Sequence, residues 1–274
     1  MNRIYGYAEL LEDLIRIQEA FGNELSIKII GKSVMGRLIP LIKIGRGEKK
    51  LLAVASVHGR EFVSSAFVMR CAEEFLKKGC ELKDKVLYIV PMLNPDGVEI
   101  ALQRAEPLKK PEDFSHGLFK NNANNINLNA NFPFCFHRVP KSRQGGKNAA
   151  SEPETNALIS LCEKEKFQSA VALHARGNCI FWRDFGNGRV KGDYKLADTL
   201  KENCGFELIA PTKRAEDYSG GFENWFRYKY KKPALCVELV KDDEISFADM
   251  CVNFEEAVNW QKTGCFLKIF ADFS

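Results

Sequence analysis

LLAVASVHGRE, residues 51–61, places an imidazole, a guanidinium and a carboxylate directly behind an uncharged run. The run from 51 to 57 is typical of an inner strand that is covered on both faces of its sheet. In open α/β sheets, ligands bind beyond the carboxyl ends of the strands. His58, Arg60 and Glu61 follow this strand, so they are the first candidates for a functional site.

Short apolar strands alternate with helices along most of the chain. We expect strands at 25–30, 39–44, 51–57, 86–92, 169–173, 179–182 and 234–239. We expect helices at 5–21, 62–78, 154–164, 193–203 and 222–230, and a final helix from about Ile245. This alternation predicts an α/β sheet with helices on both faces.

A polar region at about 94–150 interrupts the alternation, because asparagine, lysine, proline and glycine dominate there. Its first residues lie in PMLNPDG (91–97), which has the composition of a turn. A stretch of this length in a compact chain is typical of functional loops. We expect one domain, 1–274, that includes this long loop.

The composition argues against several classes of partner. The 40 basic and 36 acidic residues give a net charge of +4 without a basic stripe, so no nucleic-acid partner is predicted. The sequence has neither a run of eighteen apolar residues nor a signal peptide in MNRIYGYAEL. We therefore expect no membrane partner and a cytoplasmic location, with secretion as the alternative. Nine cysteines without a CxxC pair fit buried thiols in a reducing compartment. The oligomeric state is not predicted.

Two further strands also end in titratable residues, His174 and Glu238. His58, Glu61 and His174 could meet around one ion, because a catalytic zinc takes three protein ligands and leaves a position for water. An isolated HxxE pair occurs often by chance, and a histidine at a strand end is more often hydrogen-bonded within the fold. The chain has four histidines, and two of them at strand ends favour the metal interpretation.

Glu238 lies in the apolar segment PALCVELV, residues 233–240. An ionised carboxylate there is costly unless it is paired or lies in a wet site. Next to a zinc-bound water it would act as a general base. The alternative is a salt bridge to a lysine such as Lys241. We favour the general base.

Eight stretches in this order resemble the zinc metallocarboxypeptidases (carboxypeptidase A-like), which include the pancreatic digestive enzymes and their bacterial relatives. They are IGKSVMGRLIPLIKIG (30–45), HGRE (58–61), NPDGVE (94–99), NLNANFP (127–133), SEPET (151–155), LHARG (173–177), SGGFENW (219–225) and VEL (237–239). The resemblance implies a mixed, mostly parallel sheet of about eight strands with helices on both faces, as in phosphorylase/hydrolase-like folds. It also implies one zinc ion per chain and hydrolysis of a peptide-type amide.

The resemblance also implies roles for individual residues. His58, Glu61 and His174 match the zinc ligands of the family, and Glu238 matches its catalytic glutamate. Arg60 matches an arginine that lines the substrate cleft. In relatives another arginine polarises the scissile carbonyl.

The comparable stretch LFKNN (118–122) offers Lys120, which would stabilise the oxyanion as a point charge. A solvated loop lysine is the alternative for Lys120.

The sequence departs from the digestive enzymes in NLNANFP. Those relatives hold the terminal carboxylate of the substrate with an Asn–Arg pair, whereas here Asn129 precedes Ala130, so the bidentate clamp is missing. Either Arg176 or Arg143 takes over this carboxylate, or the substrate is not held by an ordinary C-terminal carboxylate. Asn127 replaces an aspartate that orients a zinc-bound histidine, so we expect a lower zinc affinity.

Two positions near SGGFENW bear on specificity. The mobile tyrosine of the family matches Glu216 by spacing, with Tyr218 nearby as the candidate for substrate binding. Glu223 lies where relatives have a determinant of the specificity pocket, and an acid there favours a substrate ammonium group. A solvated residue that opens the helix after Gly221 is the alternative for Glu223.

These departures resemble the bacterial branch that cleaves γ-D-glutamyl–meso-diaminopimelate bonds in cell-wall peptides. Diaminopimelate carries a side-chain ammonium, which suits Glu223, and a cytoplasmic enzyme of this kind would recycle wall fragments. The expected partner is a peptide or muropeptide substrate. One alternative is a carboxypeptidase for basic C-terminal residues that uses Arg176 as its anchor. Others are a catalytically silent module that binds wall peptides and a deacylase of amino acids or small amides.

Overall fold

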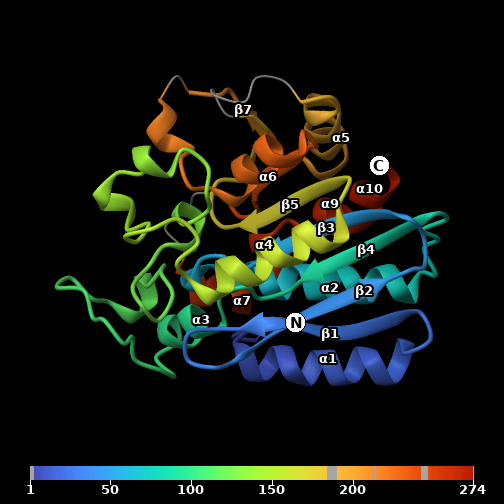
Figure 1. Cartoon of the computed structure of the whole chain (residues 1–274). Helices are drawn as coiled ribbons and strands as arrows, with labels where there is room; N and C mark the ends of the chain where they lie inside the picture. The colour runs from blue at the N-terminus through green and yellow to red at the C-terminus, as the bar shows by residue number, and fades with distance from the viewer. Residues whose placement is uncertain (1–2, 184–189, 213, 242–245, 274) are drawn as a thin grey trace.

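An eight-stranded mixed sheet runs through the protein (Figure 1), whose computed structural model describes residues 3–183, 190–212, 214–241 and 246–273. The strand order is β1-β2-β4-β3-β5-β8-β6-β7. The strands are β1 (Leu25–Lys32), β2 (Leu38–Ile44), β3 (Lys49–Ala55), β4 (Lys85–Val90), β5 (Ser169–His174), β6 (Cys179–Phe181), β7 (Glu207–Ile209) and β8 (Ala234–Glu238). Parallel pairs join β4 to β3, β3 to β5, β5 to β8 and β6 to β7, so the predicted mixed, mostly parallel sheet is confirmed.

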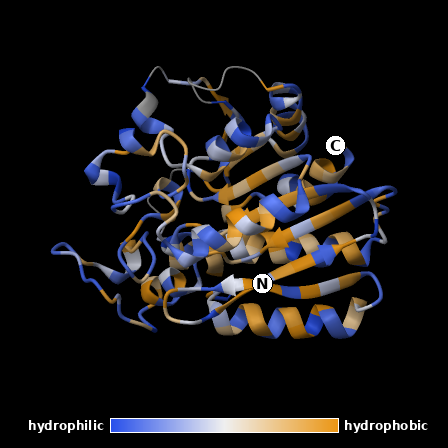
Figure 2. Cartoon of the chain, in the orientation of Figure 1, coloured by the Kyte–Doolittle hydropathy of each residue, from blue (hydrophilic) through white to orange (hydrophobic). Residues whose placement is uncertain are grey.

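The inner strands are buried on both faces. Every residue of β5 is buried, as are the last five residues of β3 and of β4. Figure 2 shows these strands as the apolar centre of the molecule. This burial explains why residues 51–55 carry no charge.

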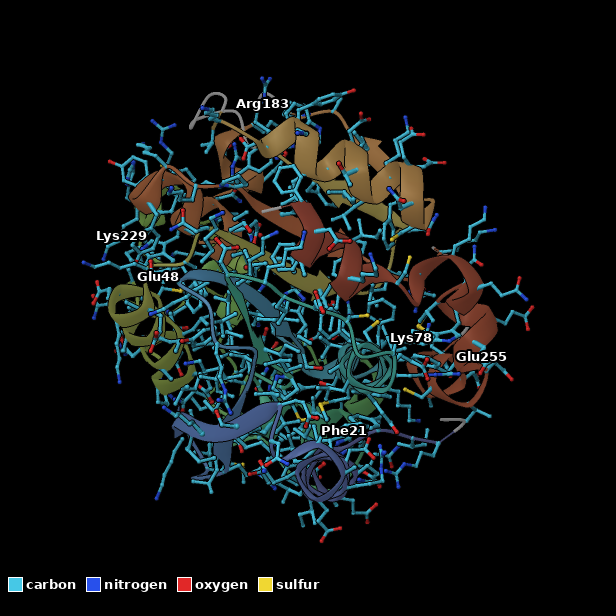
Figure 3. The ribbon with its side chains drawn as sticks, turned by 90° about the vertical axis from the view of Figure 1, so that its right-hand side faces the viewer. Phe21, Glu48, Lys78, Arg183, Lys229 and Glu255 are labelled. Carbon is cyan, nitrogen blue, oxygen red and sulfur yellow. The ribbon has the colours of Figure 1, made fainter. Side chains whose placement is uncertain are left out.

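Helices cover both faces of the sheet. Figure 3 shows the molecule turned by 90°, with Lys229 beside one helical layer and Lys78 and Glu255 beside the other. One buried cluster joins the sheet to α1, α2, α5 and the C-terminal helices, and a second cluster joins it to α4 and α6. The helices are α1 (Tyr7–Phe21), α2 (Val63–Lys77), α3 (Pro95–Ala101), α4 (Pro153–Glu165), α5 (Asp193–Cys204), α6 (Phe222–Tyr230), α7 (Phe247–Val252), α8 (Phe254–Ala257), α9 (Trp260–Thr263) and α10 (Phe266–Phe273).

The prediction of a turn at NPDG is wrong, because Pro95 begins helix α3. Asn94 caps this helix by accepting a hydrogen bond from the Gly97 amide at 2.9 Å. Proline is favoured at the first position of a helix, because an amide hydrogen there would have no partner within the helix. The residues of NPDG are therefore typical both of a turn and of the start of a helix.

Other differences concern element boundaries. Strand β3 ends at Ala55, two residues before the prediction, because Ser56 has a left-handed φ of 45°. The expected final helix is four short helices, α7 to α10, and its predicted first residue, Ile245, lies outside the described residues. Strand β7 was not predicted, since its three residues are too few for a clear alternation.

The polar region after α3 forms an ordered surface of short turns, on the left of Figure 1. The turns are His116–Leu118, Leu128–Ala130, Phe136–Arg138 and Lys141–Arg143. Asparagine side chains hold the backbone there. The Asn122 side-chain oxygen accepts hydrogen bonds from the amides of Asn124 and Ile126, both at 3.1 Å. Short polar side chains can satisfy backbone groups that lack partners in a helix or sheet, which explains the many asparagines.

All nine cysteines lie in the described part of the chain, and none forms a disulfide. Six of them are buried. Among the described residues, no helix is long and apolar enough to cross a membrane.

Gly220 joins this polar region to helix α6. Its amide donates to the Phe134 carbonyl at 2.8 Å, and its own carbonyl accepts from the Phe132 amide at 2.9 Å. Its φ is +74°, and a Cβ there would lie 2.3 Å from the Ala130 carbonyl oxygen. Only glycine fits this close approach between the two backbones.

We predict that Gly220→Ala destabilises the protein far more than Gly36→Ala. Gly36 also has a positive φ, +85°, but a Cβ added there would have no atom within 4 Å. Gly36→Ala should therefore cost about 1 kcal/mol of backbone strain, while Gly220→Ala should cost about 1–3 kcal/mol more through overpacking. Urea unfolding measures both values. Equal losses would show that the approach to Ala130 is not constrained.

Candidate active site

The carboxyl ends of three neighbouring parallel strands bring the predicted residues together. Strand β5 lies between β3 and β8 in the sheet. His174 is the last residue of β5, and it is in register with Glu238, the last residue of β8. His58 follows β3 and begins the turn Gly59–Glu61. Residues far apart in sequence therefore meet at one edge of the sheet.

His58, Glu61 and His174 form a compact buried cluster. Their side chains each offer one ligand atom, and these atoms all lie within 4.8 Å of one another. The Nδ1 atom of His58 is 2.8 Å from Glu61 Oε1, and the Nδ1 atom of His174 is 2.9 Å from Glu61 Oε2. The two Nδ1 atoms are 3.2 Å apart. The carboxylate therefore bridges the two imidazoles.

Asn127 defines the tautomer of His58. The Nε2 atom of His58 lies 3.1 Å from Asn127 Oδ1, which also accepts the Asn129 amide at 3.0 Å. An amide oxygen only accepts hydrogen bonds, so Nε2 carries the hydrogen and Nδ1 presents its lone pair to the cluster. Fixing the tautomer of a ligand histidine in this way is a usual function of groups behind a metal site.

Burial and charge act on the cluster in opposite directions. Burial lowers the pKa of His58 to about 3, so this ring is neutral near pH 7. Burial also disfavours charge on His174, but its hydrogen bond to Glu61 and nearby carboxylates raise its pKa to about 8. Burial disfavours ionisation of Glu61 as well, yet the two imidazoles hold its pKa well below the usual range. The two imidazoles therefore stabilise the negative charge of Glu61 within the cluster.

The donor set fits a metal ion of the zinc type. Two imidazole nitrogens and one carboxylate oxygen converge, all on buried side chains. These are the ligand types and the ligand number of catalytic zinc sites. His58, Glu61 and His174 could therefore hold zinc, and the structure brings together the three residues that the sequence predicted.

Glu238 lies beside this cluster with unused hydrogen-bonding capacity. Its Oε2 atom is buried and has no hydrogen-bond partner among the described residues. The other oxygen accepts a weak contact from the Cys236 thiol, at 4.0 Å. Burial raises the pKa of Glu238 to about 8, against the opposing charges of His174 and Lys120. A salt bridge to Lys241, the sequence-based alternative, is therefore not what satisfies Oε2.

Lys120 is half-buried near the same cluster. Its carbonyl accepts the Gly59 amide at 2.9 Å, which fixes it beside the turn that carries His58 and Glu61. Burial lowers the pKa of its ammonium group, and its charge acts on both His58 and Glu238. This placement differs from that of a solvated loop lysine.

A cavity of about 250 Å³, here called the Glu223 cavity, opens near β8 and the start of α6. Among the described residues, its charged lining consists of Arg143, Arg183, Asp217 and Glu223. Glu223 is 8% exposed, and its Oε2 atom has no hydrogen-bond partner among the described residues. Its Oε1 atom accepts from the Asn224 amide group at 3.1 Å. A buried acid with a free oxygen is therefore available to a ligand in this cavity.

Asn129 and Tyr218 also line the Glu223 cavity. The Asn129 side-chain oxygen accepts the Phe222 amide at 2.8 Å and so holds the first turn of α6. The Tyr218 hydroxyl accepts the Thr212 amide at 2.5 Å. Tyr218 is thus fixed in the cavity wall, while Glu216, which matched the family tyrosine by spacing, is exposed.

A second cavity of about 460 Å³, here called the Lys120 cavity, lies among the turns of the polar region. Its charged lining residues among those described are Arg60, Lys120, Arg143 and Asp113. Asn127 also lines it and connects it to the metal cluster through His58.

Arg143 lines both cavities and joins the two loops that form their walls. Its Nη1 atom donates to the carbonyls of Glu216, Asp217 and Ser219 at 2.9–3.3 Å. Its Nη2 atom donates to the Asn129 carbonyl at 2.8 Å. Most of its donors are therefore used within the protein.

Arg176 lies apart from both cavities. Its guanidinium stacks on the Phe247 ring at 4.7 Å, and Arg60 stacks on the same ring at 5.3 Å. The structure therefore brings ten of the eleven predicted site residues to the cluster or the cavities, and places Arg176 on the Phe247 ring instead.

Arg183 and Asp217 were not predicted, although both line the Glu223 cavity. Arg183 follows β6, which runs antiparallel to β8. The carboxyl end of β6 therefore lies away from the other strand ends, and the rule that identified His174 does not select Arg183. Asp217 lies in a loop between β7 and α6, and the sequence around it does not indicate that it lines a cavity.

The fold and the cluster define an α/β protein whose buried His-Glu-His donor set is that of catalytic zinc sites. A family model described as zinc carboxypeptidase matches residues 10–241. The chain therefore belongs to the zinc carboxypeptidase family.

The chain is 27% identical over 266 residues to gamma-D-glutamyl-L-diamino acid endopeptidase 1 of Lysinibacillus sphaericus. The match covers 86% of this chain and 65% of the relative, which is thus considerably longer. Bovine thrombin-activatable fibrinolysis inhibitor has a TM-score of 0.77 at 17% identity, covering 99% of this chain and 98% of that one. The murein-tripeptide amidase of Escherichia coli O157 has a TM-score of 0.55 at 19% identity, covering 85% and 89%. These two likenesses establish the fold.

Zinc should stabilise the folded protein through the three clustered side chains. At a zinc concentration a hundred times its Kd, we expect the free energy of unfolding to rise by about 2.7 kcal/mol. His174→Ala should remove this gain, whereas His137→Ala, which changes an exposed histidine outside the cluster, should keep it. Thermal unfolding with zinc and with chelator measures the effect. Undiminished stabilisation of His174→Ala would place the metal elsewhere.

Proposed function

We propose that this protein hydrolyses the amide bond between a γ-D-glutamyl group and a diamino acid, most specifically meso-diaminopimelate, in cell-wall peptides. The observation that carries the proposal is the free, buried carboxylate oxygen of Glu223 in a cavity whose wall includes Cys236, two residues before Glu238. The name of the Lysinibacillus relative describes the same bond type.

In this proposal His58, Glu61 and His174 hold one zinc ion per chain. When bound, zinc lowers the pKa of an attacking water and polarises the scissile carbonyl. Asn127 keeps the lone pair of His58 Nδ1 directed toward the metal position. These side chains do not themselves exchange protons with the substrate.

Glu238 moves the proton. The free Oε2 atom takes a proton from the water while the water oxygen attacks the carbonyl carbon. The same proton then passes to the amide nitrogen as the C–N bond breaks, so that the leaving group departs as a neutral amine. Burial of Glu238 raises its pKa to about 8, which suits a group that must both take and return a proton near neutral pH.

Lys120 supplies positive charge to the carbonyl oxygen when that oxygen becomes negative. The ammonium is half-buried, so water screens it less than it would screen an exposed lysine.

The Glu223 cavity would hold the diamino acid. Glu223 pairs with its side-chain ammonium, and Arg183 offers a buried Nε donor that has no partner among the described residues. Diaminopimelate carries both an ammonium and a carboxylate at the end of its side chain, so both groups would find a partner. Asn129, Arg143 and Tyr218 form the walls that set the size of this cavity.

A carboxypeptidase for basic C-terminal residues is the second candidate function. It needs an anchor for the terminal carboxylate, and Ala130 does not provide one. Arg176 lines neither cavity, and Arg143 donates most of its hydrogen bonds to backbone carbonyls. These placements favour the endopeptidase-type substrate over the carboxypeptidase. The free Oε2 atom of Glu238 favours a working enzyme over a silent peptide-binding module.

We further propose that residues 1–274 form one catalytic domain that acts on wall fragments in the cytoplasm. Nine unpaired cysteines support a reducing compartment. Deacylation of a small amide, the remaining alternative, would leave the Glu223 cavity without an occupant.

Glu238→Gln should abolish turnover but leave zinc bound. Glutamine keeps the shape of glutamate and cannot accept the proton, so we expect kcat on a γ-D-glutamyl–diaminopimelate peptide to fall roughly 10²–10⁴-fold. Metal analysis of the purified variant should give the wild-type zinc content. Hydrolysis at the wild-type rate in this variant would reject Glu238 as the base.

Glu223→Gln should remove selectivity for the ammonium group. We expect kcat/KM for the diaminopimelate peptide to fall roughly 10–100-fold, as for loss of a charge-assisted hydrogen bond. A matched peptide with 2-aminopimelate, which keeps the side-chain carboxylate and lacks only the ammonium, should be nearly unaffected. Asp217→Asn is the control, because Asp217 lines the same cavity but its side chain is 41% exposed. Equal losses on both peptides would contradict the assigned pairing.

A further inference from the structure

The position of Glu238 distinguishes the two sides of the site. The amine that leaves must receive its proton from Glu238, so the amine half of the substrate lies on the β8 side. Cys236, two residues before Glu238 in β8, lines the Glu223 cavity. The acyl half of the substrate must then extend to the other side of the metal cluster. Asn127, which contacts His58, also lines the Lys120 cavity, whereas Cys236 and Glu223 do not, so we assign the acyl half to that cavity.

The Lys120 cavity is basic. Arg60, Lys120 and Arg143 are half-buried in its lining, whereas Asp113, the one acid among its described lining residues, is exposed. Charges that are partly removed from water interact more strongly with a ligand than an exposed charge does. The cavity therefore favours an anionic group on the acyl side of the scissile bond.

The Arg60 side chain is held in place, and its Nε donor is unused among the described residues. Its guanidinium stacks on the Phe247 ring at 5.3 Å, and its Nη1 atom makes one long contact, 3.5 Å, to the Leu118 carbonyl. Its Nε atom is buried and has no hydrogen-bond partner among the described residues. A buried donor without a partner is costly, so a ligand that accepts its hydrogen bond gains affinity.

A γ-linked glutamate carries an anion where an α-linked residue does not. The scissile carbonyl is then the side-chain carbonyl, and the α-carboxylate stays free, two methylene groups and the α-carbon away. An ordinary α-linked peptide has a neutral amide along its acyl-side backbone. A basic acyl-side cavity therefore recognises the γ linkage itself.

We propose that Arg60 binds the free α-carboxylate of the γ-glutamyl group in the Lys120 cavity. The proposal rests on the function proposed above and adds the acyl half of the substrate to it. Lys120 stays beside the carbonyl oxygen, while Arg60 holds the carboxylate further along the cavity. Arg60 is thus a specificity-determining residue for γ-glutamyl bonds.

The test compares two peptides that differ in one group. One is L-Ala-γ-D-glutamyl-diaminopimelate, and the other carries D-isoglutamine, in which the α-carboxylate is an uncharged amide. We expect the zinc-loaded wild type to cleave the carboxylate peptide with a kcat/KM roughly 10–100 times higher, as for a charge-assisted hydrogen bond. Arg60→Gln should bring the ratio close to one, chiefly by slowing the carboxylate peptide.

Two further variants separate recognition from structural damage. Arg60→Lys restores the charge without the fork of donors, so it should recover part of the ratio. Arg176→Gln changes the other arginine on the Phe247 ring, which does not line the cavity. Whatever Arg176→Gln does to the rate, the ratio of the two peptides should keep its wild-type value.

The possible failures are distinguishable. Equal cleavage of both peptides by the wild type, or an unchanged ratio in Arg60→Gln, would overturn the role of Arg60 and leave the γ-glutamyl peptidase intact. Cleavage of neither peptide would overturn the proposed function, and the recognition of the α-carboxylate with it.

Discussion

Parallel pairing of β3, β5 and β8 is the constraint on which the rest of the site depends. Because β5 lies between the other two, their carboxyl ends open at one edge, and His174 and Glu238 stand in register there. The turn after β3 supplies His58 and Glu61 at the same edge. Backbone hydrogen bonds inside a buried sheet thus fix side chains that must lie within a few ångströms of one another. Helices on both faces keep this edge rigid, while the loops beyond it are free to vary.

The acids of the site suit bound groups of positive charge. Glu61, Glu223 and Glu238 are largely buried, and the free oxygens of Glu223 and Glu238 have no partner among the described residues. A protein tolerates a buried acid without a partner where a bound ligand or metal ion pairs with it. In the proposed mechanism, the zinc ion would pair with Glu61, the transferred proton would occupy Glu238, and the substrate ammonium would pair with Glu223. The Lys120 cavity, to which we assign the acyl half of the substrate, has the opposite charge, because Arg60 and Lys120 line it.

The sequence allowed prediction of the residues whose position follows from strand order, and less of those placed by loops. Apolar runs identified β3, β5 and β8, and the titratable residues at their carboxyl ends are the metal cluster and Glu238. Arg183 is not predicted by the strand-end rule, because β6 runs antiparallel to β8. The helix that begins at NPDG is not predicted, because its capping residues are also typical of turns. The cavity walls depend on contacts such as that of Gly220 with Ala130, which join segments about ninety positions apart and have no local signal. The metal-ligand and general-base assignments stay predictions, as does the choice of substrate.

The metal cluster is tested most directly by a crystal structure of the zinc-loaded protein with anomalous diffraction measured at the zinc edge. We predict one strong peak per chain, about 2.0–2.2 Å from the Nδ1 atoms of His58 and His174 and from a Glu61 oxygen. Glu238 should approach the side that these three residues leave open. A zinc ion held by cysteines, or a peak that only one of the two histidines contacts, would contradict the assignment.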